Sequence, residues 1–291
     1  MVTITGAGGQ SKSVKFTQKG LSKSSDIATV LESDELGRWM EIPETDTEGL
    51  YYYTHQMNVS GRECRNFSYG WDPVNLVALW VAYPLNSFTI GSGYRTGEWG
   101  VDPKVPRNYQ PILYSPYRGY YDRGHQCPSA DRLTYDANVQ TFYGTNMTPQ
   151  LGSLNSSAWS NLEGMVRKWS RQFDTVYVVT GCVVNGSTGK AYDNDGKAIT
   201  VPSGYYKALL GYKGIGTVAD TGNNGGYTAI GFYFDHRTYE SSPKAIMEQA
   251  VTINRLEEIT GLNLFVNLER ESVTISNRVE STYNSWWEKN M

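Results

Sequence analysis

The most informative stretch of this chain is residues 120–132, whose sequence reads YYDRGHQCPSADR. It places His125 two residues after Arg123 and three residues after Asp122. The whole chain of 291 residues contains only 3 histidines, so a site built from several histidines is disfavoured. If histidine performs chemistry here, we expect a single residue to do so.

Two further segments follow this stretch and complete a local pattern. Residues 143–150 (YGTNMTPQ) predict a short strand, and residues 154–169 (LNSSAWSNLEGMVRKW) predict a helix. We expect Ser153 or Asn155 to cap the start of that helix. The predicted order is therefore a strand that carries the histidine, a strand that carries an asparagine, and a helix that opens with an asparagine.

This order suits the hydrolysis of a phosphodiester bond with one metal ion. The reaction needs a base for water, and it needs positive charge at the scissile phosphate. A histidine with a pKa near its ordinary value can serve as the base. Mg²⁺ prefers oxygen ligands and keeps several waters, so the amide oxygen of Asn155 qualifies as a ligand. Glu163 lies roughly 12 Å further along the helix axis, where it can reach a water of the ion.

The same residues resemble the DNA/RNA non-specific endonucleases, also called ββα-metal or His-Me finger nucleases. The matching motifs are Asp-Arg-Gly-His at 122–125, Pro128, Asn-Met-Thr-Pro-Gln at 146–150, Leu154-Asn155, Trp159 and Leu162-Glu163. Weaker similarity covers most of the chain after residue 50. The resemblance implies a sequence-non-specific endonuclease that hydrolyses DNA and RNA with Mg²⁺, for which Mn²⁺ or another divalent cation can substitute.

The resemblance also implies a role for each site residue. His125 is expected to be the general base, and Asn155 the one direct protein ligand of Mg²⁺. Glu163 is expected to hold a metal-bound water, and Asn146 to orient the site. Contacts to the phosphate are expected from three arginines: Arg123, Arg167 and Arg95. Arg107 is an alternative to Arg95.

Several of these residues also have a simpler structural interpretation. Glu163 could form a salt bridge with Arg167 one helical turn away. Arg123 could pair with Asp122 or Asp131. We expect Asp122 to pair with an arginine or to cap a turn, and not to bind the metal. The remaining histidines are expected to be structural or exposed: His55 and His236.

The rest of the sequence predicts an α+β fold, with a mainly antiparallel central sheet flanked by helices and a ββα-metal finger as the active site. Residues 75–83 form a nearly continuous apolar run, which fits a buried strand or a buried helix. Residues 246–260 carry apolar residues at helical spacing, and Gly261 predicts a C-cap. Three β-rich segments predict further strands: residues 175–181, 205–212 and 228–234.

The N-terminal residues predict a separate hairpin. Residues 1–5 and 13–17 alternate in polarity around a glycine turn, which resembles the last hairpin of a small β-sandwich. We assign residues 1–22 to this remnant and its linker, and residues 30–291 to the endonuclease domain. The first residues lack the pattern of a signal peptide. The resemblance suggests an extracellular, periplasmic or cell-surface location.

Composition restricts the possible partners. The longest apolar runs are too short for a membrane span, and 3 cysteines are too few for a disulfide framework. The formal net charge of -3 argues against a broad basic face for nucleic acid. We therefore expect weak, salt-sensitive binding of DNA and RNA substrates through a few arginines and the cation, with no obligatory protein partner.

Two other classes of function stay open at this point. The N-terminal hairpin is compatible with a catalytically weak or inactive binder of nucleic acid or surface polysaccharide on a nuclease scaffold. A phosphodiesterase that acts on small substrates would use the same residues. The joint presence of His125, Asn155 and Glu163 favours an active enzyme over the binder.

Overall fold

The computed structural model describes residues 27, 29–45, 47–187, 189–214 and 225–291, together with the backbone of residues 2–5 and 11–14. The strands are β1 Val2–Thr5, β2 Ser11–Val14, β3 Tyr51–Val59, β4 Arg62–Asp72, β5 Val77–Leu85, β6 Tyr121–His125, β7 Met147–Leu151, β8 Thr175–Val183, β9 Lys190–Tyr192, β10 Ala198–Thr200, β11 Gly204–Tyr212, β12 Tyr227–Asp235 and β13 Ala250–Val251. The helices are α2 Ser87–Ile90, α3 Tyr135–Thr141, α4 Ser160–Ser170, α5 Pro243–Met247, α6 Ile253–Thr260, α7 Val266–Glu271, α8 Val273–Ser281 and α9 Trp286–Lys289. Shorter helical turns are η1 Arg107–Tyr109, η2 Ser129–Asp131, η3 Gly144–Asn146 and η4 Leu154–Trp159.

The main sheet confirms the predicted antiparallel architecture. Within the described residues it has seven strands in the order β13-β12-β11-β8-β5-β4-β3, and every neighbouring pair is antiparallel. Two small sheets, β6-β7 and β9-β10, lie outside it. The predicted N-terminal hairpin is present as β1 and β2, with Val2 opposite Val14, although its second strand begins at Ser11 and not at residue 13. Residues 15–26 lie outside the described residues.

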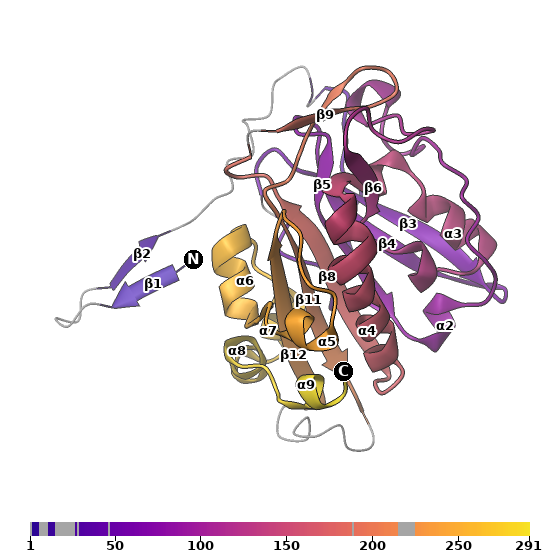
Figure 1. Cartoon of the computed structure of the whole chain (residues 1–291). Helices are drawn as coiled ribbons and strands as arrows, with labels where there is room; N and C mark the ends of the chain where they lie inside the picture. Colours follow the sequence, from indigo (N-terminus) through magenta and orange to yellow (C-terminus); the bar gives the residue numbers. More distant parts are fainter. Residues whose placement is uncertain are drawn as a thin grey trace.

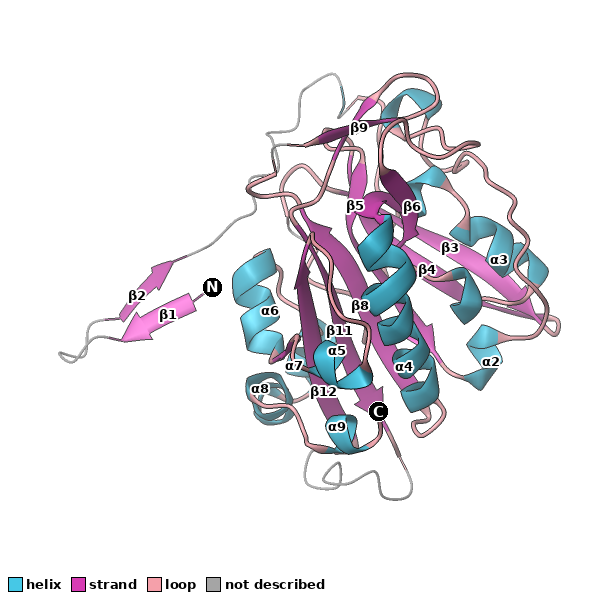
Figure 2. Cartoon of the chain, viewed as in Figure 1, coloured by secondary structure: helices cyan, strands magenta, loops and turns pink. Residues whose placement is uncertain are grey.

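Helices cover both faces of the main sheet. Trp169 of α4 stacks on Phe232 of β12 with 6.1 Å between ring centroids. The preceding residue on the strand, Gly231, faces the other way, where a Cβ would lie 2.6 Å from Leu256 of α6. Because successive strand residues point to opposite faces, α4 and α6 pack on opposite sides. Figures 1 and 2 show α4 running across β8 and β11, with β6 at one end of the helix.

Most of the apolar run at residues 75–83 forms a strand and not a helix. It forms β5, which pairs with β4 on one side and β8 on the other. All its residues are buried except Pro84, which is partly exposed. A strand in the middle of a sheet that is covered on both faces needs apolar side chains on both, and this explains why the run shows no alternation. Of the free cysteines, Cys127 and Cys182 are buried.

The single helix predicted for residues 246–260 is wrong. The segment forms α5, then the short strand β13, then α6. The break occurs because Ala250 pairs with Phe232 at the edge of the main sheet. Thr252 then starts the second helix, where its side chain accepts a hydrogen bond from the backbone N–H of Arg255. The predicted C-cap is confirmed, since Gly261 adopts a left-handed conformation with φ 71°.

The predicted cap of the helix at 154–169 is also wrong. Neither Ser153 nor Trp159, the residues before η4 and α4, makes a side-chain cap hydrogen bond. The hydroxyl of Ser153 instead bonds to Thr238, and the amide of Asn155 bonds to Asp122. The helix opens as a wide turn with a kink at Ser157. The capping side chains are therefore used for contacts across the molecule.

Candidate active site

The ββα arrangement places the predicted residues in one region. β6 and β7 pair antiparallel, with His125 opposite Met147 and Asp122 opposite Gln150. The chain then enters η4, which packs against β7 and continues into α4. The expected strand, strand and helix order is therefore formed, but the second strand starts at Met147, and Asn146 ends the helical turn η3 directly before it. His125 comes from the end of the first strand, and Asn155 from the first turn of the helix.

His125 has a buried nitrogen that no residue satisfies. Its ring is partly exposed, but Nε2 is buried and has no hydrogen-bond partner among the described residues. Trp99 and Phe142 pack edge-on against the ring, with centroids 5.6 and 5.0 Å away. Burial and the charge of Arg95 lower the pKa of His125 to about 3, against the opposing effect of a hydrogen bond to the backbone of Arg123. The ring is therefore neutral near pH 7, with its Nε2 lone pair available.

Arg95, and not Arg107, is the arginine brought close to His125. The guanidinium of Arg95 lies 4.7 Å from the centre of the Phe142 ring, which also packs against His125. It makes no hydrogen bond or ion pair within the described residues. Arg107 points elsewhere, since its Nη2 donates to both carboxylate oxygens of Asp195, at 3.1 and 2.8 Å. The geometry therefore favours Arg95 over Arg107 as the arginine that contacts the phosphate.

Arg123 is held by the backbone and by an aromatic ring. Its Nη1 donates to the carbonyls of Leu113 and Tyr114, at 2.9 and 3.3 Å. Its guanidinium carbon lies 3.3 Å from the centre of the Trp99 ring. The alternative pairing of Arg123 with Asp122 or Asp131 is not formed. Nε and Nη2 make no hydrogen bond in the described part of the chain, so both stay available to a phosphate.

Asp122 orients Asn155. The Nδ2 of Asn155 donates to Oδ2 of Asp122 at 3.0 Å. The expectation that Asp122 pairs with an arginine or caps a turn is wrong: within the described ranges its carboxylate accepts from Asn155 and from no arginine or backbone N–H. An amide that donates through its nitrogen leaves its oxygen available. Among the described residues, none donates a hydrogen bond to Oδ1 of Asn155.

Glu163 and Arg167 do not pair with each other. The Nη1 of Arg167 donates to Asp131 at 2.8 Å, and the other oxygen of Asp131 accepts from the hydroxyl of Tyr83, also at 2.8 Å. The alternative salt bridge within the helix is therefore absent from the described residues. Burial raises the pKa of Glu163 to about 7, although the nearby charge of Lys207 opposes this shift.

Asn146 fastens the turn that follows His125. Its Oδ1 accepts from the backbone N–H of Cys127 at 2.9 Å. Its Nδ2 donates to the carbonyls of Cys127 and Thr141, at 2.9 and 2.8 Å. Both ends of the amide are thus used by the backbone. This geometry suits a residue that orients the site and leaves no free amide group for a substrate.

The sequence reasoning did not single out Lys207 as part of this site. Lys207 is buried in β11, and its Nζ donates to Thr180 at 3.1 Å and lies 4.8 Å from the centre of the Trp159 ring. Among the neighbouring charges, that of Lys207 lowers the pKa of Glu163 the most. The sequence feature that could have indicated this role is a lysine inside the apolar segment 205–212.

The other two histidines are structural as predicted: His55 bonds to Asp102, and His236 bonds to Leu151 and Pro202.

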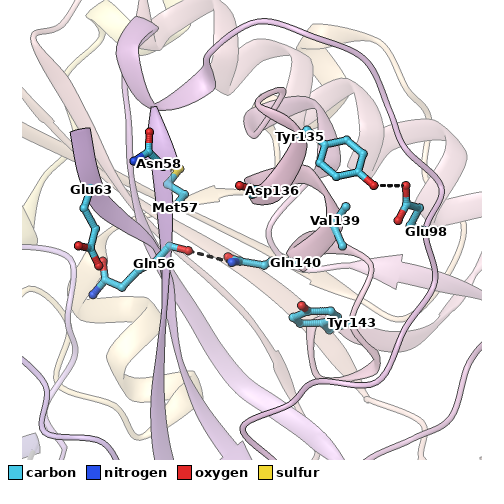
Figure 3. A pocket seen from close by; sticks show the side chains of 10 residues that line it. All are labelled: Gln56, Met57, Asn58, Glu63, Glu98, Tyr135, Asp136, Val139, Gln140 and Tyr143. Atoms are coloured by element: carbon cyan, nitrogen blue, oxygen red, sulfur yellow. Dashed lines mark hydrogen bonds between the residues drawn. The ribbon is translucent and has the colours of Figure 1, made fainter. Parts of the chain in front are cut away.

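A surface pocket of about 460 Å³ has none of these site residues in its lining. Figure 3 shows its lining side chains: Gln56, Met57, Asn58, Glu63, Glu98, Tyr135, Asp136, Val139, Gln140 and Tyr143. The lining includes three carboxylic acids and no lysine or arginine. Such a lining repels phosphate, so this pocket is not a candidate for the nucleic-acid site.

Comparison with known proteins identifies the family. A model of the DNA/RNA non-specific endonucleases matches residues 48–271. This chain belongs to that family. It is 31% identical to a nuclease of Serratia marcescens over 198 residues, which cover 66% of this chain and 69% of the relative. It is also 31% identical to human mitochondrial endonuclease G over 214 residues, covering 67% of this chain and 66% of the relative.

Two further matches differ in how much of the other protein they cover. A nuclease of Nostoc is 40% identical over 135 residues, which make up 46% of this chain and 47% of the relative, so the match spans about half of that protein. A solved structure described as the EndoG/EndoGI complex superposes with a TM-score of 0.57 at 24% identity, covering 75% of this chain and 89% of the other. That likeness supports the fold.

Proposed function

We propose that this protein is a Mg²⁺-dependent endonuclease that hydrolyses phosphodiester bonds in DNA and RNA with little sequence preference. The observation that carries the proposal is the buried Nε2 of His125, which has no hydrogen-bond partner among the described residues. The His125 ring packs against Phe142, and so does the guanidinium of Arg95, which makes no hydrogen bond or ion pair in the same part of the chain. A neutral base beside a free cation is what attack of water on a phosphate requires. Family membership supports the substrate class.

The residues present fit a hard cation with few protein ligands. Within the described residues, no cluster of three or more His, Cys, Asp or Glu side chains could hold a metal ion. Asn155 offers an amide oxygen to which no described residue donates, and Asp122 holds that amide in place. Mg²⁺ keeps several waters and needs few protein oxygens. Asn155 would therefore hold the ion directly, and Glu163 would contribute through a water.

Each side chain has a defined task in this proposal. His125 would take a proton from the attacking water at Nε2. Arg95 and Arg123 would bind phosphate oxygens and balance the charge that develops on them. When bound, the cation would supply further positive charge at the scissile phosphate and the leaving oxygen. Arg167 forms an ion pair with Asp131, so it can bind a phosphate only if its guanidinium contacts Asp131 and the phosphate at the same time.

The test uses supercoiled plasmid and RNA as separate substrates. We expect cleavage of both in Mg²⁺ and none in EDTA, and a loss of about 10²- to 10⁴-fold in kcat for His125→Ala. Arg95→Gln is expected to slow cleavage strongly. The matched variant Arg107→Gln removes a guanidinium that is already paired with Asp195, and it should stay near the wild-type rate. Intact substrates in Mg²⁺ would refute the proposal.

The same assay separates the two alternatives. Binding of plasmid without cleavage in Mg²⁺ and in Mn²⁺ would indicate a non-catalytic binder. Faster turnover of a small phosphodiester than of plasmid would indicate a small-substrate phosphodiesterase. An extracellular, periplasmic or cell-surface location stays a prediction, as does the assignment of residues 1–22 to a remnant module and of residues 30–291 to the enzyme domain. Among the described helices, none is long and apolar enough to cross a membrane.

A further inference from the structure

Three tyrosines next to the candidate site expose much of their surface. Tyr114, Tyr120 and Tyr192 are 56%, 95% and 47% exposed. The first two belong to the loop that leads into β6, and the third ends β9. A tyrosine carries a large apolar ring, and rings gathered at a surface commonly mark a place where a ligand covers them.

Hydrogen bonds hold the two segments that carry these tyrosines together. The backbone N–H of Arg118 donates to the carbonyl of Tyr192 at 2.8 Å. The N–H of Ser115 donates to Oδ1 of Asn194 at 2.8 Å, and the N–H of Asn194 donates to the carbonyl of Ile112 at 2.9 Å. The two segments that carry the three exposed tyrosines are therefore fastened to each other. We call Tyr114, Tyr120 and Tyr192 the tyrosine platform.

The tyrosine platform is continuous with the candidate active site. Arg123, two residues before His125, donates to the carbonyls of Leu113 and Tyr114. Tyr120 directly precedes β6, the strand that ends in His125. Figure 1 shows β6 and β9 at the same end of the molecule. The tyrosine platform thus lies toward the start of β6, beyond Arg123 as seen from His125. A chain bound at the histidine that continues past Arg123 would therefore meet the tyrosine platform.

The charge of this surface also suits a nucleic acid. The loop 110–120 contains Arg118 and no acidic residue. The nearest buried acid, Asp193, is occupied by the backbone N–H groups of Ile112 and Lys197 and by the ammonium of Lys197. The guanidinium of Arg118 donates to the carbonyl of Asn194 at 3.2 Å and forms no ion pair with an acid within the described ranges. The surface therefore combines aromatic rings with a positive charge, which is the pattern of single-strand binding sites.

We propose that the tyrosine platform stacks unpaired bases of a single-stranded DNA or RNA segment whose backbone continues to His125. This inference rests on the proposed function and narrows its substrate. Stacking on a tyrosine needs an exposed base face, and in a duplex the neighbouring base pairs cover those faces. Every base has such a face, so the tyrosine platform would favour single strands without reading their sequence.

The test measures binding without cleavage. Fluorescence anisotropy in EDTA would follow a labelled 20-nucleotide single strand and the duplex of the same sequence, each with His125→Ala protein. Adding Tyr114→Ala, Tyr120→Ala and Tyr192→Ala together should weaken single-strand binding by roughly 5- to 10-fold for each ring that contacts a base, and duplex binding by less than about twofold. The corresponding three Tyr→Phe changes keep the rings and should restore single-strand binding.

A matched control is Tyr283→Ala, which removes another exposed tyrosine, 40% exposed, between α8 and α9. It should leave both affinities unchanged, and thermal melting would verify that all variants are folded. Equal losses on single strand and duplex, or no loss on either, would overturn the inference. Failure of the proposed function would show separately, as wild-type protein that binds single strands and cleaves nothing in Mg²⁺.

Discussion

At the scale of single residues, Gly124 shows why the motif around His125 contains a glycine. A Cβ at this position would lie 2.5 Å from Oε1 and 2.7 Å from Cβ of Gln150 on the paired strand. The side chain of Gln150 therefore closes over the backbone of Gly124, and the hairpin can form this contact only with a glycine there. The constraint is steric, and it is independent of the chemistry of the neighbouring histidine.

We expect Gly124→Ala to destabilise the protein by about 1–3 kcal/mol, because the two side chains must move apart in a packed hairpin. Gly164→Ala is the matched control. Nothing lies within 4 Å of a Cβ at that exposed position of α4, so a gain of about 0.5–1 kcal/mol is expected from helix propensity. Urea unfolding would measure both changes. Equal effects of the two substitutions would contradict the steric explanation.

His125 offers a second prediction at this scale. Burial and Arg95 hold its pKa at about 3, so its ring should stay neutral between pH 5 and 8 in the metal-free protein. The chain has 3 histidines, so proton NMR can follow each imidazole. In Arg95→Gln the midpoint of His125 should move upward, because a repelling positive charge is gone. A wild-type midpoint near the ordinary histidine value would contradict the burial of Nε2.

At the scale of elements, Asp102 joins the arginine-bearing loop to the sheet and to η3. One of its oxygens, Oδ2, accepts hydrogen bonds from His55 at 2.9 Å, Tyr69 at 2.6 Å and Thr145 at 2.6 Å. Burial alone would raise the pKa of Asp102, but the charge and hydrogen bond of His55 bring it below its ordinary value. The loop that carries Trp99 to the His125 ring is thus anchored by one buried carboxylate.

Asp102→Asn should destabilise the protein by roughly 2–4 kcal/mol, because an amide cannot accept all three hydrogen bonds at one oxygen, and buried partners lose theirs. We also expect a lower rate of plasmid cleavage, since Trp99 and Arg95 lie on the loosened loop. Asp195→Asn removes an exposed ion pair with Arg107 and should cost less than about 1 kcal/mol. Chemical unfolding of both variants checks this difference, and similar losses would refute the anchoring role.

At the scale of the whole molecule, His236 ties the ββα hairpin to the main sheet. Its Nε2 accepts from the backbone N–H of Leu151 at the end of β7, at 2.8 Å. Its Nδ1 bonds to the carbonyl of Pro202 at 2.8 Å. Burial lowers the pKa of His236. Only the neutral ring can accept at Nε2, so protonation breaks this connection.

The resulting pH dependence has a definite sign. A lowered pKa in the folded state means that unfolding takes up a proton below the ordinary histidine pKa. The stability that His236 contributes is therefore fully present above about pH 6.5 and declines as the pH falls below it. Urea unfolding at pH 7.5 and 5.5 should show a smaller pH effect for His236→Gln than for the wild type. An identical pH effect would contradict this assignment.

Net charge predicts how the molecule responds to salt. A chain with a net charge of -3 must hold its substrate through a few local cations. Two or three phosphate contacts predict a rise in KM for plasmid of roughly 10- to 40-fold between 50 and 200 mM NaCl. Arg95→Gln should flatten this dependence. Steady-state kinetics at several salt concentrations would measure it, and a KM that is insensitive to salt would refute it.

The sequence by itself determined the family resemblance, the antiparallel α+β fold and the identity of the hairpin and helix around His125. These follow from local patterns, in which spacing along the chain translates directly into strands, turns and helical faces. Even there, the helix predicted for 246–260 failed, because pairing with the edge of the sheet outweighed its helical spacing.

Only the tertiary structure decided which partners the charged residues take. It brought Arg95 to His125 and paired Arg107 with Asp195, gave Arg167 to Asp131 and not to Glu163, and used Asp122 to orient Asn155. These contacts join segments far apart in the chain. Their strength depends on burial, which changes both the cost of a charge and its pKa. No local spacing encodes that burial, so these choices became visible only in the folded molecule.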